Sequence, residues 1–296
     1  MRIRRLVAIT AATGTLALGL AACGDSTKDA PKAASSQSSA AEPAEQKEVS
    51  PVDALRNAAK AVEEQASAKV TVDSVDPADG NTKGEGTLSW KKGSEGAELS
   101  MDAGSDADLR DMAGPDGKVH MTMADGSVYL SVEGEMAEVA PGKKWLKLDG
   151  ASAKDNPAND LPHGPAASLA ALSTAADLAK AGEEQVSGTA ATHYTGTVDI
   201  EKLAADTSVL ELISKDERDA YVKELDTTGL KKTVAIEAWI GADGLAVKTV
   251  ESGKTAKGPS KVTIVYSGYS ATSTVKAPPA KDVTTFAEIL KSAAQG

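Results

Sequence analysis

The chain has 296 residues, 41% of them hydrophobic, a formal charge of −11 at pH 7 and a single cysteine. A chain this acidic is a poor candidate for binding nucleic acid or anionic lipid surfaces, because both carry negative charge. One cysteine excludes an intramolecular disulfide, so the fold must depend on its core for stability.

The N-terminus has the pattern of a secretory signal. Arg2, Arg4 and Arg5 precede an uncharged run, residues 6–22, in which small residues dilute the hydrophobicity below that of a stable membrane span. Residues 20–23, Leu-Ala-Ala-Cys, resemble the bacterial lipobox, in which the cysteine thiol receives a diacylglyceryl group and the preceding peptide is removed. We therefore expect a signal peptide over 1–22 and lipidation at Cys23. General secretion is the expected export route, with twin-arginine export as the alternative that Arg4-Arg5 leaves open.

Lipidation places the mature chain on the outer face of the cytoplasmic membrane, where each acyl chain contributes about 0.8 kcal/mol per buried CH₂. Removal of residues 1–22 leaves 29 basic and 43 acidic residues, a formal charge of −14. Residues 24–49 contain almost no large apolar side chain and predict a disordered tether about 25 to 30 Å long. Residues 50–296 then form one large domain.

The domain is expected to open with a helix. Ser50 is an N-cap candidate, Pro51 suits the first turn, and Asp53 stands at the acidic position of a capping box. Apolar residues recur at helical spacing at Val52, Leu55, Ala59, Val62 and Ala66. Alternating segments predict strands over 69–75, 87–92, 97–102, 118–124 and 127–134, with Asp-Gly turns at 79–80, 116–117 and 125–126.

The middle of the chain predicts helix and the last part predicts strand again. The expected elements are a helix over 165–182, a strand over 184–200, helices over 208–213 and 214–225, strands over 233–241, 245–252 and 261–269, and a terminal helix over 284–294. Ser214 and Glu217 form a capping box, and Asp243-Gly244 turns a hairpin. This order predicts an α+β domain with one broad antiparallel sheet. Such a sheet with helices on one face can hold a packed core or an apolar cavity.

The sequence lacks the motifs of the common enzymes. It contains no Gly-x-Ser-x-Gly and no His-Glu-x-x-His, and Lys248 stands where a Walker loop ending at residues 252–255 needs glycine. The histidines, His120, His163 and His193, are scattered, so we expect no metal, no cofactor and no catalytic residue. The pair Met121 and Met123 could bind a soft metal, but methionines on one strand face more often fill a core or line a cavity.

Four stretches, in this order, resemble the actinobacterial lipoproteins of the LppX/LprG type. They are residues 129–149, 184–203, 235–252 and 265–283, and the likeness covers essentially all of 50–285. The resemblance implies a LolA-like half-barrel: a curved antiparallel sheet with helices on its concave face. It also implies a function, the binding of acyl chains of envelope lipids or glycolipids in an apolar cavity between helices and sheet.

On this reading the apolar faces of strands and helices supply the cavity lining. The candidates are Val119, Met121, Met123, Val128, Leu130, Val132, Val209, Leu210, Ile213, Val234, Ile236 and Ile240. For each residue the alternative is an ordinary dry core. The expected partners are the membrane, through the lipid on Cys23, a lipid ligand, and a membrane transporter or regulator. Two other hypotheses stay open: a sensor or interaction domain that binds a protein partner in envelope regulation, and a wall-associated structural protein with a filled core.

Overall fold

The computed structural model describes residues 49–77, 80–103, 107–134, 136–148, 164–227, 229–230 and 232–294. The chain divides into two units, residues 1–47 and 48–296, and all described residues belong to the second. The predicted signal peptide, Cys23, nearly all of the tether and His163 lie outside the described residues. None of the helices in the described ranges combines the length and the hydrophobicity that a membrane crossing needs.

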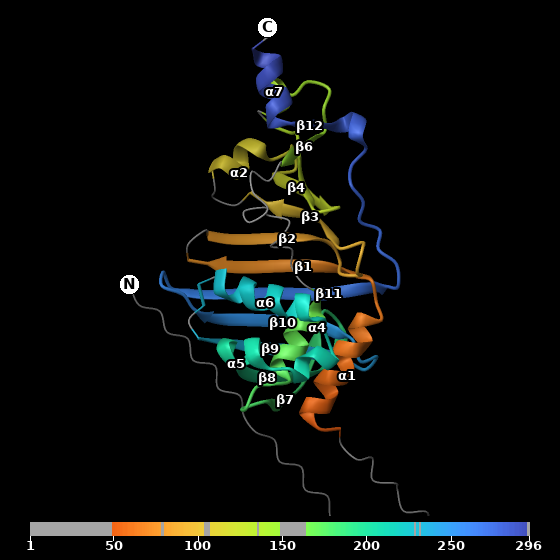
Figure 1. Cartoon of the computed structure of the whole chain (residues 1–296), viewed down its shortest axis with the longest axis vertical. Coiled ribbons are helices and arrows are strands. Elements are labelled where there is room, and N and C mark those ends of the chain that lie inside the picture. The colour runs from red at the N-terminus through yellow and green to blue at the C-terminus, as the bar shows by residue number, and fades with distance from the viewer. Residues whose placement is uncertain are drawn as a thin grey trace, which may run out of the picture. The chain divides into compact units, whose positions relative to one another are not determined.

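The second unit is built on one open sheet of twelve strands (Figure 1). The spatial order is β12-β6-β5-β4-β3-β2-β1-β11-β10-β9-β8-β7, so that β12 and β7 are the edge strands. The strands are β1 (Ser67–Asp76), β2 (Gly80–Ser89), β3 (Gly96–Asp102), β4 (Lys118–Ala124), β5 (Ser127–Ser131), β6 (Trp145–Leu148), β7 (Ala179–Val186), β8 (Thr189–Asp199), β9 (Thr233–Gly241), β10 (Ala246–Lys254), β11 (Pro259–Ser270) and β12 (Val283–Thr285).

Pairing of β1 with β11 joins the early and late strands into this single sheet. Val70 lies opposite Tyr266 across that pair, and Val72 lies opposite Ile264. The strand pairs are antiparallel except β12, which runs parallel to β6. The predicted class, α+β with one broad antiparallel sheet, is confirmed.

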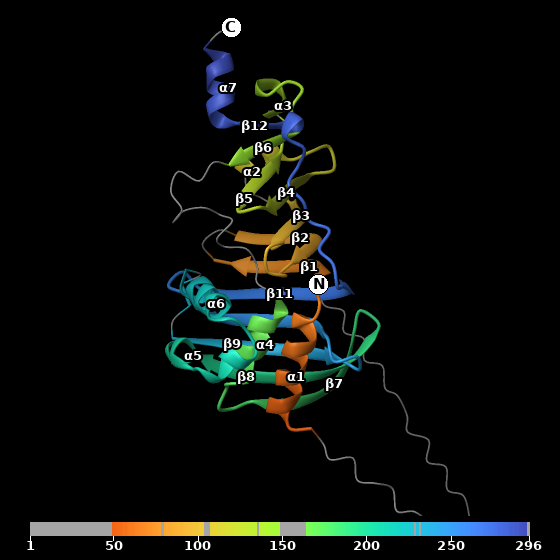
Figure 2. The same cartoon turned by 45° about the vertical axis from the view of Figure 1, so that its right-hand side comes forward.

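Four helices cover the β7–β11 part of one sheet face (Figures 1 and 2). They are α1 (Pro51–Glu63), α4 (Pro165–Leu172), α5 (Ile200–Ala205) and α6 (Lys215–Thr227). The other helical elements are α2 (Ala107–Met112), α3 (Met136–Val139), α7 (Phe286–Ala293) and the 3₁₀ turns η2 (Ser208–Glu211) and η3 (Ala280–Asp282). The predicted arrangement of helices on one sheet face is therefore present.

Helix caps and hairpin turns, which depend on residues close together in the sequence, lie where the sequence predicts them. Ser50 Oγ accepts a hydrogen bond from the backbone N–H of Asp53 at 3.1 Å and so caps α1. Ser214 and Glu217 exchange the two bonds of a capping box, at 3.0 and 3.2 Å, before α6. Asp125 and Gly126 both adopt positive φ, 53° and 68°, as a tight β4–β5 hairpin requires.

The predicted helix over 165–182 is wrong beyond Leu172. Residues 179–186 form β7 instead, paired with β8. The chain turns after α4, where Ser173 Oγ and Thr174 Oγ1 donate to the carbonyls of Ala170 and Ala171. Asp177 Oδ1 then accepts the backbone N–H of Thr197 at 2.7 Å, which fixes this turn against β8. Pairing with a distant strand overrides the helical propensity of the alanine-rich segment.

Other boundaries also differ from the sequence prediction. The strand predicted over 184–200 is divided by a hairpin at Ser187 and Gly188, both at positive φ. The second predicted strand ends at Ser89 and the fifth at Ser131. Of residues 208–213, predicted as an α-helix, only 208–211 are helical, and they form a short 3₁₀ turn. The sequence analysis did not predict α2, α3, α5, β6 or β12, which are all six residues or shorter.

Candidate functional site

We use the word compartment for the region between the helices α1, α4, α5 and α6 and the strands β7–β11 that they cover. The helix α4 lies at its centre. All eight of its residues are buried, and they are apolar apart from Ser168. It packs on β8, β9 and β10 on one side and on α1 and α6 on the others. A helix that is apolar all round is buried all round, and the alanines of α4 let the neighbouring elements approach closely.

The predicted lining residues of the late strands and helices meet in this compartment. Val234, Ile236 and Ile240 project from β9 into the main core, where Val209 and Ile213 also lie. Leu210 does not join them, because it is 38% exposed. Consecutive residues of a 3₁₀ turn point about 120° apart, so η2 buries Val209 and turns Leu210 outward.

The predicted residues of the early strands separate into two groups. Met123 and Val128 belong to the main core, Met121 and Leu130 lie partly buried at its edge, and Val119 is buried. Val132 instead packs in a second cluster with Ala140 and Leu146. Because β5 ends at Ser131, strand alternation no longer determines which way Val132 points.

A small cavity of about 60 Å³ lies in the compartment beside α4. Its walls come from α4, α6, β10, β11 and the segment after α6: Ser168, Tyr221, Glu224, Leu225, Leu230, Thr249, Glu251, Ser252, Gly253, Ser260, Val262, Ile264 and Tyr266. None of the predicted lining residues is among them. The cavity is therefore a feature that the sequence analysis missed, and its lining is more polar than the predicted set.

A carboxyl group is at the centre of the polar part of this lining. Glu251 Oε1 accepts hydrogen bonds from Ser168 Oγ at 2.6 Å and from Tyr221 Oη at 2.7 Å. Tyr266 Oη and Thr249 Oγ1 form a second polar pair at 3.2 Å. These groups connect α4 and α6 to β10 and β11 through hydrogen bonds inside a mainly apolar core.

Burial determines the protonation of this cluster. It raises the pKa of the Glu251 carboxyl above its usual range, an effect that the bonds from Ser168 and Tyr221 partly offset. Burial likewise raises the pKa of Tyr221, and the neighbouring Glu251 raises it further. The site can thus present a neutral carboxyl and neutral phenols, which donate as well as accept hydrogen bonds.

His193 occupies a structural position on the opposite sheet face. Its ring stacks on Trp239, with ring centroids 4.0 Å apart, and Lys248 Nζ lies 3.9 Å from the Trp239 ring centroid. Nδ1 and Nε2 of His193 lie 3.1 and 2.9 Å from carboxylate oxygens of Glu184 and Glu237. The cluster satisfies its own polar groups, which fits the structural interpretation of His193.

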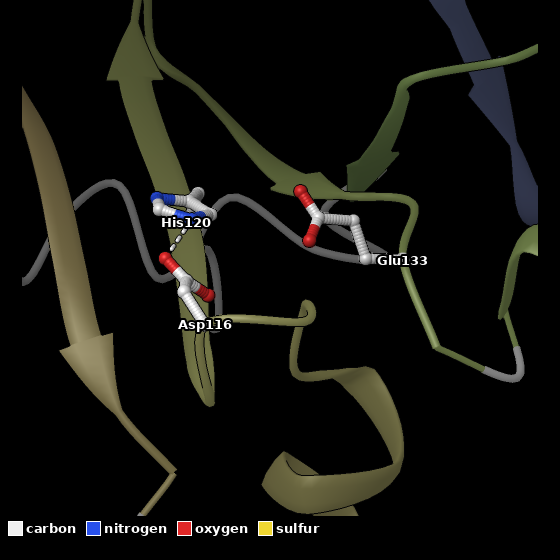
Figure 3. A group of neighbouring side chains, drawn as sticks. All are labelled: Asp116, His120 and Glu133. Atoms are coloured by element: carbon white, nitrogen blue, oxygen red, sulfur yellow. Dashed lines mark hydrogen bonds and ion pairs between the residues drawn. The ribbon is translucent and has the colours of Figure 1, made fainter.

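A second group of polar side chains lies at β4 (Figure 3). Asp116, His120 and Glu133 each offer one ligand atom, and these atoms lie within 4.8 Å of one another. The histidine and the two carboxylates could hold a metal ion. The sequence analysis expected no metal site, because the histidines are scattered along the chain, and it did not consider one histidine together with two carboxylates.

The relatives of this chain include one that is more than 30% identical to it. No family model matches the chain. A 31.2 kDa uncharacterised protein of Streptomyces griseus, encoded between rplA and rplJ, is 32% identical over 221 residues, which cover 71% of this chain and 70% of the relative. The chain belongs to the family of this Streptomyces protein. A second relative, a candidate lipoprotein of Streptomyces coelicolor, is 25% identical over 252 residues, 81% of this chain and 76% of that protein.

The solved structures similar to this member of the family include two mycobacterial lipoproteins of the type that the sequence resembles. LprF from Mycobacterium bovis has a TM-score of 0.47 and 15% identity, with 77% of this chain and 96% of that one covered. LppX from Mycobacterium tuberculosis has a TM-score of 0.43 and 13% identity, with 76% of this chain and 98% of that one covered.

Proposed function

We propose that the mature protein is a non-enzymatic lipoprotein, anchored through Cys23 on the outer face of the cytoplasmic membrane, that binds acyl-chain lipids or glycolipids of the envelope. The lipobox at residues 20–23 supports the anchor, as does the relative in Streptomyces coelicolor that is described as a candidate lipoprotein. The domains would then be a signal peptide over 1–22, a lipidated tether over 23–49 and a lipid-binding domain over 50–296.

The observation that carries the binding proposal is the polar cluster inside the apolar compartment. Ser168, Tyr221 and Glu251 converge beside a cavity whose lining also contains the aliphatic side chains of Leu225, Leu230, Val262 and Ile264. An amphiphile needs this combination, because its head group requires hydrogen-bond partners and its acyl chains require apolar contacts. Both hydrogen bonds to Glu251 end on Oε1, so Oε2 is the atom that we assign to the ligand.

The ligand would need the compartment to open. A cavity of about 60 Å³ has the volume of about two water molecules, whereas ligand pockets measure about 300–1,000 Å³. An acyl chain would therefore enter by displacing α4 and α6 from the sheet. The predicted lining residues of β9, now packed in the core, would become the walls of the opened cavity.

The composition of α4 lowers the cost of this opening. Half of its residues are alanines, Ala166, Ala167, Ala170 and Ala171, and these bury less apolar area than leucines would. Each Å² of apolar area exposed costs about 25 cal/mol, so a helix with small side chains separates from a sheet more easily. The incoming acyl chain would cover the same area again and offset the cost.

Titration with a fluorescent fatty acid tests the assignment of Glu251. We expect the mature chain carrying Cys23→Ser to bind the probe, and Glu251→Leu to weaken the affinity about tenfold or more by removing a buried hydrogen-bonding group. Glu251→Gln keeps a donor and an acceptor and should stay within a few-fold of the parent.

Glu237→Gln is the matched control, because Glu237 is on the opposite face of neighbouring β9. Thermal unfolding of each variant confirms that the fold is retained. Absence of probe binding by the parent chain would contradict the proposed function, whereas equal binding by Glu251→Leu would contradict only the role of this carboxyl.

A further inference from the structure

The group Asp116, His120 and Glu133 joins three segments at one end of β4. Asp116 belongs to the turn before β4, His120 is the third residue of β4, and Glu133 lies two residues beyond the end of β5. The imidazole and both carboxylates face the same space in Figure 3. His120 and Glu133 border an open groove of about 450 Å³, whose polar lining also includes Glu98, Ser100, Ser131 and Lys144.

Contacts outside the group orient its histidine. Ser100 and His120 are opposite each other on β3 and β4, and Ser100 Oγ lies 2.8 Å from His120 Nδ1. When Nδ1 carries the proton and donates it to Ser100, the Nε2 lone pair is available on the side of the carboxylates. This is the usual arrangement of a histidine that binds a metal, where one nitrogen is the ligand and the other is held by an oxygen.

A backbone hydrogen bond fixes one of the two carboxylates, and close packing against a glycine places the other. Asp116 Oδ1 accepts a hydrogen bond from the backbone N–H of Lys118 at 3.0 Å. The Glu133 carboxylate packs against the backbone of Gly114. A Cβ atom added to Gly114 would be 1.7 Å from Glu133 Oε2. Gly114 is thus needed for the Glu133 carboxylate to reach this position.

The distances suit ligands of one small cation. Asp116 Oδ2 and His120 Nε2 lie 3.2 Å apart in a hydrogen bond that a bound ion would replace, and two ligands on a tetrahedral zinc ion with bonds of about 2.1 Å are about 3.4 Å apart. Glu133, whose ligand atom is within 4.8 Å of the other two, must close by up to about 1.4 Å, a movement that rotation of its side chain supplies. His120 is 33% and Asp116 49% exposed in their side chains, so an ion and its water ligand can enter.

We propose that Asp116, His120 and Glu133 bind a divalent transition metal ion of the zinc type, with water at the fourth position. Imidazole together with carboxylates favours zinc over magnesium or calcium, which prefer oxygen ligands alone. The bound ion would connect the turn before β4 to the segment after β5 and so stabilise this end of the sheet. This site is separate from Glu251 and does not depend on lipid binding.

His193 provides an internal comparison. It too lies between two carboxylates, but Glu184 is at Nδ1 and Glu237 is at Nε2, on opposite sides of the ring. Those carboxylates cannot converge with one nitrogen on a single ion. A histidine with two acidic neighbours is therefore not sufficient for a site, whereas the geometry at His120 is convergent.

Calorimetric titration with ZnCl₂ tests the proposal on the untagged mature chain with Cys23→Ser, which removes the only thiol. We expect one zinc ion per chain. We also expect a higher melting temperature with zinc, because an ion that binds the folded state stabilises it. His120→Gln and Glu133→Gln should abolish one-to-one binding, and Ser100→Ala should weaken it about tenfold through the loss of His120 orientation.

His193→Gln is the control and should bind zinc as the parent does. The proposal is overturned if the parent binds no zinc, if His120→Gln and Glu133→Gln bind it unchanged, or if His193→Gln loses it as they do. Binding of calcium that depends on Asp116 and Glu133 but not on His120 would also overturn it.

Discussion

Replacement of Cys23 by serine should release the protein from the membrane. The parent chain is expected in the membrane fraction, extractable only by detergent, with a mass increased by a diacylglyceryl group. Two acyl chains give stable anchoring because each buried CH₂ contributes about 0.8 kcal/mol, while the chain's own charge of −11, before processing, opposes adsorption to anionic lipid. Cys23→Ser cannot form the thioether, so the exported protein should be soluble once residues 1–22 are removed.

Fractionation of cells followed by immunoblotting measures this effect. Ser26→Ala, three residues away in the predicted tether, changes a hydroxyl without touching the thiol and should leave the protein in the membrane fraction. A Cys23→Ser protein that still sediments with membranes would mean that another part of the chain holds it there.

Truncation of Leu169 to alanine should destabilise the fold strongly. Leu169 is 0% exposed, at the middle of a helix that packs on β8, β9 and β10. Removal of a fully buried leucine side chain costs about 2–5 kcal/mol, from lost transfer free energy and the cavity left behind. Urea unfolding should therefore show a much lower midpoint with little change of slope.

Leu290→Ala is the matched control for Leu169→Ala. Leu290 is 70% exposed on α7, so its truncation should change the free energy of unfolding by no more than about 0.5 kcal/mol. If Leu169→Ala cost as little as this control, α4 would not be packed between the outer helices and the sheet in solution.

The sequence predicts those parts of the fold that depend on local signals. The Ser50 cap, the Asp125-Gly126 turn and the 118–124 and 233–241 strands follow from residues next to one another, and the structure has them at the predicted places. The segment after Leu172 was mispredicted because its helical composition is local, whereas its pairing with β8 involves residues as distant as Thr195.

The sites were harder to predict, because their residues come from separate elements. Ser168, Tyr221 and Glu251 meet only once α4, α6 and β10 are packed together. The sequence feature that could have indicated this site is Ser168, a polar residue among the alanines of the apolar segment 165–172. Asp116 and Glu133 similarly converge on His120 only through the pairing of β4 with β5.

Native mass spectrometry tests the central claim, lipid binding by this compartment, most directly. The chain with Cys23→Ser, exported by its own signal in a Streptomyces host and purified without detergent, carries no anchor lipid that could be mistaken for ligand. We predict a complex of one chain with one envelope lipid or glycolipid, identified after extraction by its mass. A chain that is free of lipid under these conditions, and that takes up none when mixed with extracted envelope lipids, would contradict the account and favour the interaction-domain or filled-core alternatives.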